Sequence, residues 1–433
     1  DDLDAWLNTA DDLPTAEQQL AGVLGLASPD ADAALNVLAE LESRRQSAGL
    51  AYALAFLALR YERVDRALEA LDRAERRGWD PVACDELRLR AQLAREDGEA
   101  VSAVAQRLRS AYREDRAAAL AVGQLLLDAQ AWTLAREQFA FVAQFWPQDP
   151  AARMALGLLD AQSGALASAR EQFLALWETG ARNDEAAWQL GRLAGLEKRW
   201  SDSASWFERV EDGGRYLDAQ LGLAQVRAEQ GDIPAARAQL SMLRDQQPED
   251  AARLWRAEAE ILQKAGQVDA AMDLLDAAIA DTQAFDLYYQ RALLHDTRGD
   301  LESARADLQF IIDRDADNAA ALNALGYMLA DDNRELALAR QLVERALALR
   351  PDDPAIRDSL GWVLYRQGEL AAAEEALQAA YAVYPDPEVA AHLGEVLWHR
   401  GRLAEARQVL SEAIRATPSH PKLLRAWMQF GQP

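Results

Sequence analysis

Two histidines and one glutamate near the carboxyl-terminal end of the sequence have a spacing that could bind a metal ion. His392, Glu395 and His399 recur after three and then four residues, which places them on one face of a helix. Zinc needs its ligands at about 2 Å, whereas seven residues of helix separate the two histidines by roughly 10.5 Å of rise. One straight helix cannot bring both imidazoles to the same ion, so we expect no metal site here.

The signatures of catalysis do not occur in this sequence. It has no phosphate-binding loop GxxxxGK[ST], no GxSxG nucleophile elbow and no HExxH zinc motif. The only cysteine, Cys84, excludes an internal disulfide and a thiolate metal cluster, and we interpret it as a buried structural thiol. The 71 acidic residues form many carboxylate pairs, most of which we expect on solvated helix faces. We therefore expect no enzymatic activity and no cofactor.

Length, composition and charge limit the classes of partner. The 433 residues are 50% hydrophobic, enough for a large core, and 46 basic against 71 acidic residues give a formal charge of −25. This excess of acidic residues disfavours binding to nucleic acids and to anionic lipid surfaces, because proteins recognise both through clustered Lys and Arg. No run approaches the ~18 apolar residues of a membrane span. No signal-like apolar run follows Asp1, so we expect any targeting segment to lie outside this numbering.

A repeat of about 34 residues dominates the chain. Gly361 lies within a predicted helix, where glycine costs roughly 1 kcal/mol relative to alanine, and Gly394 has similar surroundings one repeat later. Extending this register backwards places a small residue every 32 to 36 positions. Twelve positions after each small residue, Ala occurs in ten of twelve cases, the exceptions being Ser203 and Leu338. The small residues are Gly22, Ala55, Ala91, Gly123, Gly157, Gly191, Ala224, Ala259, Ala292, Gly326, Gly361 and Gly394.

Each repeat predicts a helical hairpin, in which small residues let two helices approach to about 8–10 Å. The pattern resembles the tetratricopeptide repeat, and it predicts an all-α, right-handed superhelical solenoid of eleven or twelve hairpins over residues 15–420. We expect residues 1–14 to form an acidic amphipathic helix and residues 421–433 a capping helix with a tail. The weakest repeat lies at residues 180–216, where we expect a kink.

One stripe of side chains on the first helix of each hairpin is not needed for packing within the hairpin. It lies about 90° from the small residue, and we expect it to line the concave face. Trp and Tyr beside Arg and carboxylates are typical of protein-binding hot spots; alternatively, Trp362 and Trp398 pack against neighbouring repeats. The predicted binding residues are Tyr289, Asn323, Tyr327, Asp358, Trp362, Tyr365, Arg366, Glu395, Trp398 and His399.

The last repeats carry a more specific resemblance, over residues 318–415. The motifs NALGYMLAD, LRPDDPAIRDSLGWVLYRQG and PDPEVAAHLGEVLWHRG resemble a proteobacterial family of tetratricopeptide outer-membrane lipoproteins, which includes the lipoprotein-binding partner of the carboxyl-terminal processing protease. The positions that carry this resemblance are Asn323, Gly326, Tyr327, Asp358, Gly361, Trp362, Tyr365, Arg366, His392, Gly394, Glu395 and Trp398.

The resemblance implies a periplasmic adaptor, anchored in the outer membrane by a lipidated cysteine. Such an adaptor binds the carboxyl-terminal processing protease and its peptidoglycan hydrolase substrates and promotes their proteolysis. Cys84 falls inside a repeat, so we expect the lipidated anchor outside this numbering. Two other readings stay open: a scaffold for envelope polysaccharide export or another envelope assembly, and a regulatory repeat array belonging to an enzyme.

Overall fold

The computed structural model describes residues 31–211 and 213–431, and throughout these ranges the regular structure is helical. The all-α prediction is therefore confirmed for the described chain. The helix expected at residues 1–14 and the first small residue, Gly22, lie outside the described residues. No described helix is long and apolar enough to cross a membrane.

The chain divides into two compact units, and the boundary falls after Gly222, within α14 (Tyr216–Glu229). The first unit contains α3 (Ala31–Arg45), α4 (Ala48–Arg60), α5 (Val64–Arg76), α6 (Pro81–Ala94), α7 (Gly98–Ala111), α8 (Arg116–Asp128), α9 (Trp132–Phe145), α10 (Pro150–Gln162), α11 (Leu166–Glu178), α12 (Asn183–Leu196), α13 (Trp200–Phe207) and the 3₁₀ turn η1 (Gly213–Arg215).

The second unit continues from α14 to the carboxyl-terminal end of the described chain. It contains α15 (Ile233–Gln246), the 3₁₀ turn η2 (Pro248–Asp250), α16 (Ala251–Lys264), α17 (Val268–Thr282), α18 (Phe285–Thr297), α19 (Leu301–Arg314), α20 (Ala319–Asp331), α21 (Leu336–Leu349), α22 (Pro354–Arg366), α23 (Leu370–Val383), α24 (Pro387–His399), α25 (Leu403–Ala416), α26 (Pro421–Ala426) and the π-helical turn η3 (Trp427–Gly431).

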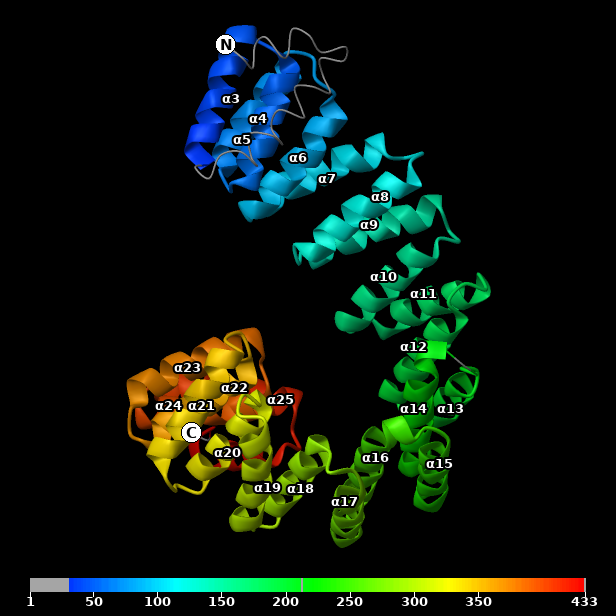
Figure 1. The fold of residues 1–433 in the computed structure, drawn as a ribbon, viewed down its shortest axis with the longest axis vertical. Helices are drawn as coiled ribbons and strands as arrows, with labels where there is room; N and C mark the ends of the chain where they lie inside the picture. Colours follow the sequence, from blue (N-terminus) through cyan, green and yellow to red (C-terminus); the bar gives the residue numbers. More distant parts are fainter. Residues whose placement is uncertain (1–30, 212, 432–433) are drawn as a thin grey trace. The chain divides into compact units, whose positions relative to one another are not determined.

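Consecutive helices pair as hairpins, from α4 with α5 to α24 with α25 (Figure 1). Local sequence explains where they begin and turn. The Asp353 carboxylate accepts hydrogen bonds from the first backbone N–H groups of α22, and Pro354 follows where no amide donor is needed. Gly368 ends α22 with a φ of +84°, and Lys198 holds the corresponding left-handed conformation after α12 with a φ of +56°.

In the described repeats that carry a glycine at the small position, the glycine lies where the two helices of a hairpin pack against each other. A Cβ added to Gly361 would lie 2.5 Å from Leu377 Cγ and 3.3 Å from the Ala373 carbonyl oxygen. Ala373, twelve positions later, contributes its backbone oxygen to this contact, and the side chain that fills the space above the glycine is that of Leu377, sixteen positions later. The same offset recurs at other crossings: Gly123 with Phe139, Gly157 with Phe173, Gly191 with Phe207 and Gly394 with Leu410.

The weakest repeat differs from its neighbours in its second helix and in the turn that follows. Its second helix, α13, has only 8 residues, and the chain then turns through η1, where Gly213 has a φ of +78°. Ser203 replaces the usual alanine and is fully buried, but its hydroxyl donates to the Gly191 carbonyl oxygen over 2.7 Å. The substitution is therefore accommodated without an unsatisfied hydroxyl.

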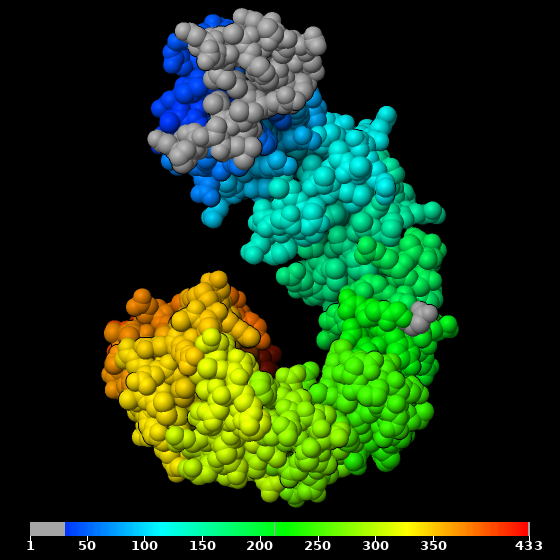
Figure 2. Space-filling view, viewed as in Figure 1, coloured from blue at the N-terminus to red at the C-terminus, as the bar shows by residue number. Residues whose placement is uncertain are grey.

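The second unit curves strongly enough to join distant repeats. In Figure 2 its surface bends from green through yellow to orange. The first helices of its last three hairpins lie side by side, α20 against α22 and α22 against α24, and the terminal α26 packs against α24. The ammonium of Lys422, on α26, hydrogen-bonds to the hydroxyl of Tyr327, 95 residues earlier on α20. This curvature determines which side chains meet on the inner face.

We expect Gly361→Ala to destabilise the second unit by about 1–3 kcal/mol, because the new Cβ overlaps Leu377. Gly98→Ala is the matched control, since a Cβ on Gly98 meets no atom within 4 Å. Hydrogen exchange of peptides from residues 354–383 measures local opening in both variants. Unchanged protection in Gly361→Ala would contradict the packing role of the crossing.

Candidate functional site

Nine of the ten predicted binding residues lie on α20, α22 and α24, the first helices of the last three hairpins, and the tenth, Tyr289, lies on α18. Tyr289 is partly buried and packs against the core that α18 shares with α20 and α22. Burial raises the pKa of its phenol. Tyr289 therefore has a packing role and lies apart from the polar cluster described below.

Trp362 is buried, so of the two alternatives for this residue the structure favours packing against the neighbouring repeats over an exposed position on the concave face. Only 6% of the residue is exposed. Its ring stacks on the His392 imidazole with centroids 4.2 Å apart, and its indole N–H donates to Asp331 Oδ1 over 3.2 Å. The curvature of the unit places α24 over the face of α22 that carries Trp362. Trp362 therefore joins three successive repeats.

Asp358 is a second predicted binding residue that the structure buries. Its carboxylate lies 3.0 Å from His392 Nδ1, and both side chains are less than a tenth exposed. The other imidazole nitrogen, Nε2, lies 3.4 Å from the Tyr327 hydroxyl oxygen. Asp358, His392 and Tyr327 thus form one chain of polar contacts inside the protein, from α22 through α24 to α20.

Lys422 closes this chain of contacts from the terminal helix. The Tyr327 hydroxyl donates to Glu388 Oε1 over 2.7 Å, and the Lys422 ammonium donates to both the Tyr327 oxygen and the Glu388 carboxylate. The ammonium also lies 4.8 Å from the centroid of the Tyr327 ring, within cation–π range. Burial, assisted by the nearby Glu388 carboxylate, raises the pKa of the Tyr327 phenol.

Glu388 is held in its ionised form. Burial alone would raise the pKa of this carboxyl, but the Lys422 ammonium and the Tyr327 hydroxyl more than offset that effect, and the net pKa lies below the ordinary glutamate value. A carboxylate that accepts hydrogen bonds beside a cation is stabilised in its charged form. The ion pair thus couples the ionisation of Glu388 to the attachment of α26.

A second group of predicted residues lies nearer the solvent. The Tyr365 hydroxyl donates to Glu395 Oε1 over 2.8 Å and lies 3.1 Å from His399 Nδ1. Burial and this hydrogen bond raise the pKa of the Tyr365 phenol. The Arg366 guanidinium lies 5.6 Å from the Trp362 ring centroid. Tyr365, Arg366 and Glu395 are partly exposed and His399 is exposed, so this group can contact a partner.

Two further predicted residues complete the inner face. Trp398 is partly buried and packs against Phe430 of η3, with ring centroids 5.9 Å apart. The Asn323 side-chain oxygen is buried and has no hydrogen-bond partner among the described residues. Such an atom carries a desolvation cost that a ligand donor would relieve.

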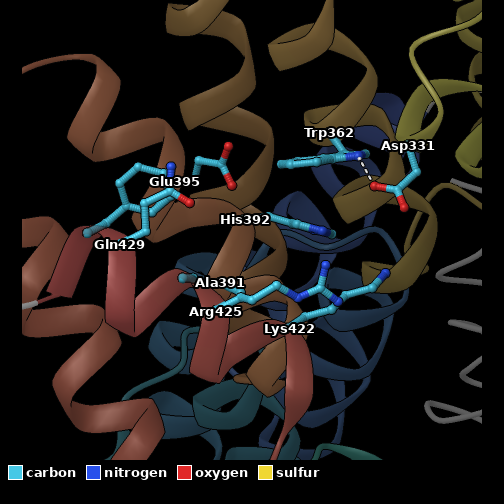
Figure 3. A pocket seen from close by; sticks show the side chains of 10 residues that line it. Asp331, Trp362, Ala391, His392, Glu395, Lys422, Arg425 and Gln429 are labelled. Carbon is cyan, nitrogen blue, oxygen red and sulfur yellow. Dashed lines mark hydrogen bonds between the residues drawn. The ribbon is translucent and has the colours of Figure 1, made fainter.

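A cavity of about 210 Å³ opens between α22, α24 and the terminal segment formed by α26 and η3. In Figure 3, Trp362 and His392 lie on one side of it, and Lys422 and Arg425 lie across from them. The lining residues are Asp331, Trp362, Ala391, His392, Glu395, Lys422, Arg425, Ala426, Gln429 and Phe430.

The sequence did not identify the terminal segment as part of the site. Lys422, Arg425 and Phe430 were assigned to a capping helix, and Glu388 was not selected. Only three lysines occur in the chain, Lys198, Lys264 and Lys422, and that rarity was the one available signal. The position of Lys422 opposite Tyr327 depends on the curvature of three repeats, which no local pattern encodes.

The imidazoles of the metal candidate face different partners. His392 contacts Asp358 and Tyr327, whereas His399 contacts Tyr365 and the carbonyl oxygen of Glu395. Within the described ranges no group of three or more His, Cys, Asp or Glu side chains is arranged to hold a metal ion. Cys84 is fully buried, and burial raises the pKa of its thiol to about 11.

Comparison with known proteins gives a family match for the repeats between residues 221 and 421. Residues 221–285, 289–354 and 359–421 match the family model described as tetratricopeptide repeat. The chain is 40% identical over 204 residues to the TPR repeat-containing protein PA4667 of Pseudomonas aeruginosa, a match that spans 47% of this chain and 35% of that protein. It is 29% identical over 109 residues to bacteriophage adsorption protein A of Escherichia coli K12, across 25% of this chain and 11% of that protein. The chain therefore spans about a third or less of these relatives' lengths.

Two solved structures illustrate the matches that the comparison returns. The thermophilic TPR protein TTC0263 of Thermus thermophilus has a TM-score of 0.38 at 22% identity, over 41% of this chain and 98% of that one. The APC/C hetero-tetramer Cut9–Hcn1 has a TM-score of 0.42 at 14% identity, over 99% of this chain and 92% of that one.

Glu388→Gln should make the second unit less sensitive to acid. Because the pKa of Glu388 is lowered in the folded unit, its contribution to stability is fully present above the ordinary glutamate pKa of about 4.3 and is lost as pH falls through the lowered value. Denaturant unfolding from pH 7 to pH 3 measures this loss. The exposed Glu412→Gln is the control, and parallel pH profiles for Glu388→Gln and the unchanged chain would disprove the coupling.

Trp362→Ala should destabilise the second unit by about 3 kcal/mol or more, because it removes a large buried ring and leaves a cavity. Trp132→Ala is the control, since Trp132 is 44% exposed, and we expect a much smaller change. Thermal melting followed by circular dichroism compares the two. Equal melting temperatures would show that Trp362 does not stabilise the fold.

Proposed function

We propose that this chain is a protein-binding adaptor whose inner face in the last three repeats docks a partner polypeptide, because residues 221–285, 289–354 and 359–421 match the tetratricopeptide repeat model. The observation that carries this proposal is the cavity together with the partly exposed Tyr365, Arg366 and Glu395 and the exposed His399. Aromatic and Arg side chains around a concave site supply contact area and directional hydrogen bonds, which is the composition of binding hot spots.

The partners that we propose come from the resemblance of residues 318–415. They are a carboxyl-terminal processing protease and its peptidoglycan hydrolase substrates. An adaptor that holds both raises the effective concentration of substrate at the protease, which increases the rate of cleavage without any catalytic group of its own. We propose accordingly that this chain acts as a scaffold and that the protease performs the hydrolysis.

The proposed location follows from the same resemblance. We propose that the full-length protein is a periplasmic lipoprotein held at the outer membrane by a lipidated amino-terminal cysteine. The net charge of −25 is compatible with such an arrangement, because it opposes direct contact of the repeats with anionic headgroups.

A reconstituted digestion tests the adaptor function. The purified protease is mixed with a peptidoglycan hydrolase, with and without this protein, and the remaining hydrolase is measured over time. We expect little loss of hydrolase with the adaptor alone and faster loss when all three are present. Absence of binding to both protease and hydrolase would refute the proposal, and specific binding to polysaccharide-export components would favour the alternative scaffold.

Variants at the inner face locate the docking site. The double variant Arg366→Ala, His399→Ala removes two side chains that reach solvent, and we expect at least about tenfold weaker binding of one partner if either residue belongs to a hot spot. Arg415→Ala, on the exposed face of α25, is the matched control. Equal affinities for the double variant and this control would place the docking surface elsewhere.

A further inference from the structure

Eight carboxylates are buried in the part of the chain that the structure describes, and one of them differs from the others in its partner. Seven form an ion pair with at least one arginine, namely Glu42, Asp85, Asp149, Asp160, Glu258, Asp307 and Glu374. The eighth, Asp358, is paired with His392. Arginine is always charged in proteins, whereas histidine is charged only when it is protonated. Among these eight pairs, only the one at Asp358 can gain or lose its positive charge with a proton.

The pair is isolated from other donors. Among the described residues, only His392 hydrogen-bonds to the Asp358 side chain, with Nδ1 3.0 Å from Oδ1 and 3.2 Å from Oδ2. Both side chains are less than a tenth exposed, so water does not replace a missing partner. A neutral imidazole would give this carboxylate one hydrogen bond, whereas an imidazolium gives it a hydrogen bond and a balancing charge. A buried carboxylate requires that balance.

The hydrogen bonds at Tyr327 also favour a second proton on His392. The Tyr327 hydroxyl has one proton, which it donates to Glu388, and its oxygen accepts from the Lys422 ammonium. The same oxygen lies 3.4 Å from His392 Nε2. Because the hydroxyl proton is already used, this contact is a hydrogen bond only when Nε2 carries a proton of its own. The geometry therefore provides an acceptor for each N–H group of an imidazolium.

The Trp362 ring covers one face of the imidazole. The ring centroids lie 4.2 Å apart with an interplanar angle of 22°, and the indole N–H is directed to Asp331. The face of an indole ring attracts cations. Protonation of His392 therefore strengthens a contact that joins α22 to α24.

The charged groups around His392 have an excess of negative charge. The titratable and charged side chains are Tyr327 and Asp331 on α20, Asp358 on α22, Glu388 and Glu395 on α24, and Lys422 and Arg425 on α26. Four carboxylates thus lie around two permanent cations. The other described elements that pack against α24, which are α23, α25 and η3, contribute no charged side chain to the cavity lining. A proton on His392 reduces this imbalance.

We propose that His392 is a proton-operated switch that sets how firmly α20, α22 and α24 are held together at the inner face. The protonated imidazole pairs with Asp358 and donates to Tyr327, and it holds the three helices as the structure shows them. Loss of the proton leaves Asp358 buried beside a neutral ring, and the helices separate more readily. The stabilisation is present at the acidic end of the range in which histidine titrates and is lost as the pH rises through that range.

The switch also has a consequence for docking. Tyr365, Glu395 and His399 lie on α22 and α24, so looser packing of these helices leaves the docking groups less well positioned and weakens partner binding. This step rests on the proposed function, whereas the switch itself does not.

Nuclear magnetic resonance of the full chain, labelled with ¹⁵N in its four histidines, tests the protonation state. Single His→Asn variants assign each pair of imidazole signals. We expect both nitrogens of His392 to carry protons at pH 5.5. An unprotonated Nε2 in the folded chain at this pH would overturn the proposal.

Asp358→Asn tests the energetic consequence, because an amide needs no balancing charge. Urea unfolding at pH 5.5 and pH 8 compares the variant with the unchanged chain, and the comparison at each pH cancels the contribution of other titrating groups. At pH 5.5 we expect Asp358→Asn to raise the unfolding equilibrium constant of the second unit about tenfold or more, as for a lost charge-assisted hydrogen bond. At pH 8 this destabilisation should largely disappear. Equal destabilisation at both pH values would refute the switch.

Two other histidines require controls. The His420 Nδ1 accepts from the Leu423 N–H at the start of α26, and a proton on that nitrogen would remove the acceptor. All chains are therefore compared in a His420→Asn background, since Asn also caps helices. His399→Asn removes the exposed imidazole of α24, and we expect it to leave the pH dependence of Asp358→Asn unchanged.

The binding of the peptidoglycan hydrolase at the two pH values tests the docking step. We expect several-fold weaker binding at pH 8 in the His399→Asn chain and no such change once Asp358→Asn is added. Equal affinity at both pH values would refute the link to docking. If unfolding follows the switch but neither protease nor hydrolase binds, the adaptor function is wrong and the switch stands. If both proteins bind but Asp358→Asn destabilises equally at both pH values, the switch is wrong and the adaptor function stands.

Discussion

The close crossing of two helices at one small residue is the constraint on which the rest of the structure depends. At Gly361 the backbone leaves room for Leu377, and the same relation holds between Gly394 and Leu410. A larger residue at the crossing would separate the helices and change the angle at which the next hairpin packs. Because each repeat contacts mainly its neighbours, small angles at each crossing accumulate along an array.

In the second unit this accumulation produces contacts between repeats that are not adjacent in sequence. Tyr327 of α20 meets Glu388 of α24 and Lys422 of α26, so side chains from three repeats share one polar cluster. The curvature of the unit brings these side chains together, and their hydrogen bonds and ion pair then stabilise that curvature. The cluster also attaches the terminal segment, whose Phe430 packs on Trp398.

The division of the inner face into buried and partly exposed groups has a functional meaning. Trp362, His392 and Asp358 are buried and fix the positions of three helices. Tyr365, Arg366 and His399 lie closer to solvent than these residues, and the terminal segment lines the cavity on the same inner face. Rigid support beneath a few accessible polar groups lowers the entropy lost when a partner docks.

The sequence by itself determined the helical hairpins, their register and the small residues at the crossings, because these depend on local propensity and on a spacing that repeats through the chain. It also placed the selected residues of α20, α22 and α24 on one face of each helix, since helical periodicity fixes which side chains share a face. Only the tertiary structure decided that Trp362 and Asp358 are buried and that Lys422 reaches Tyr327. Those outcomes depend on the packing angles of several hairpins added together. Each angle is small, and the local sequence pattern does not specify it.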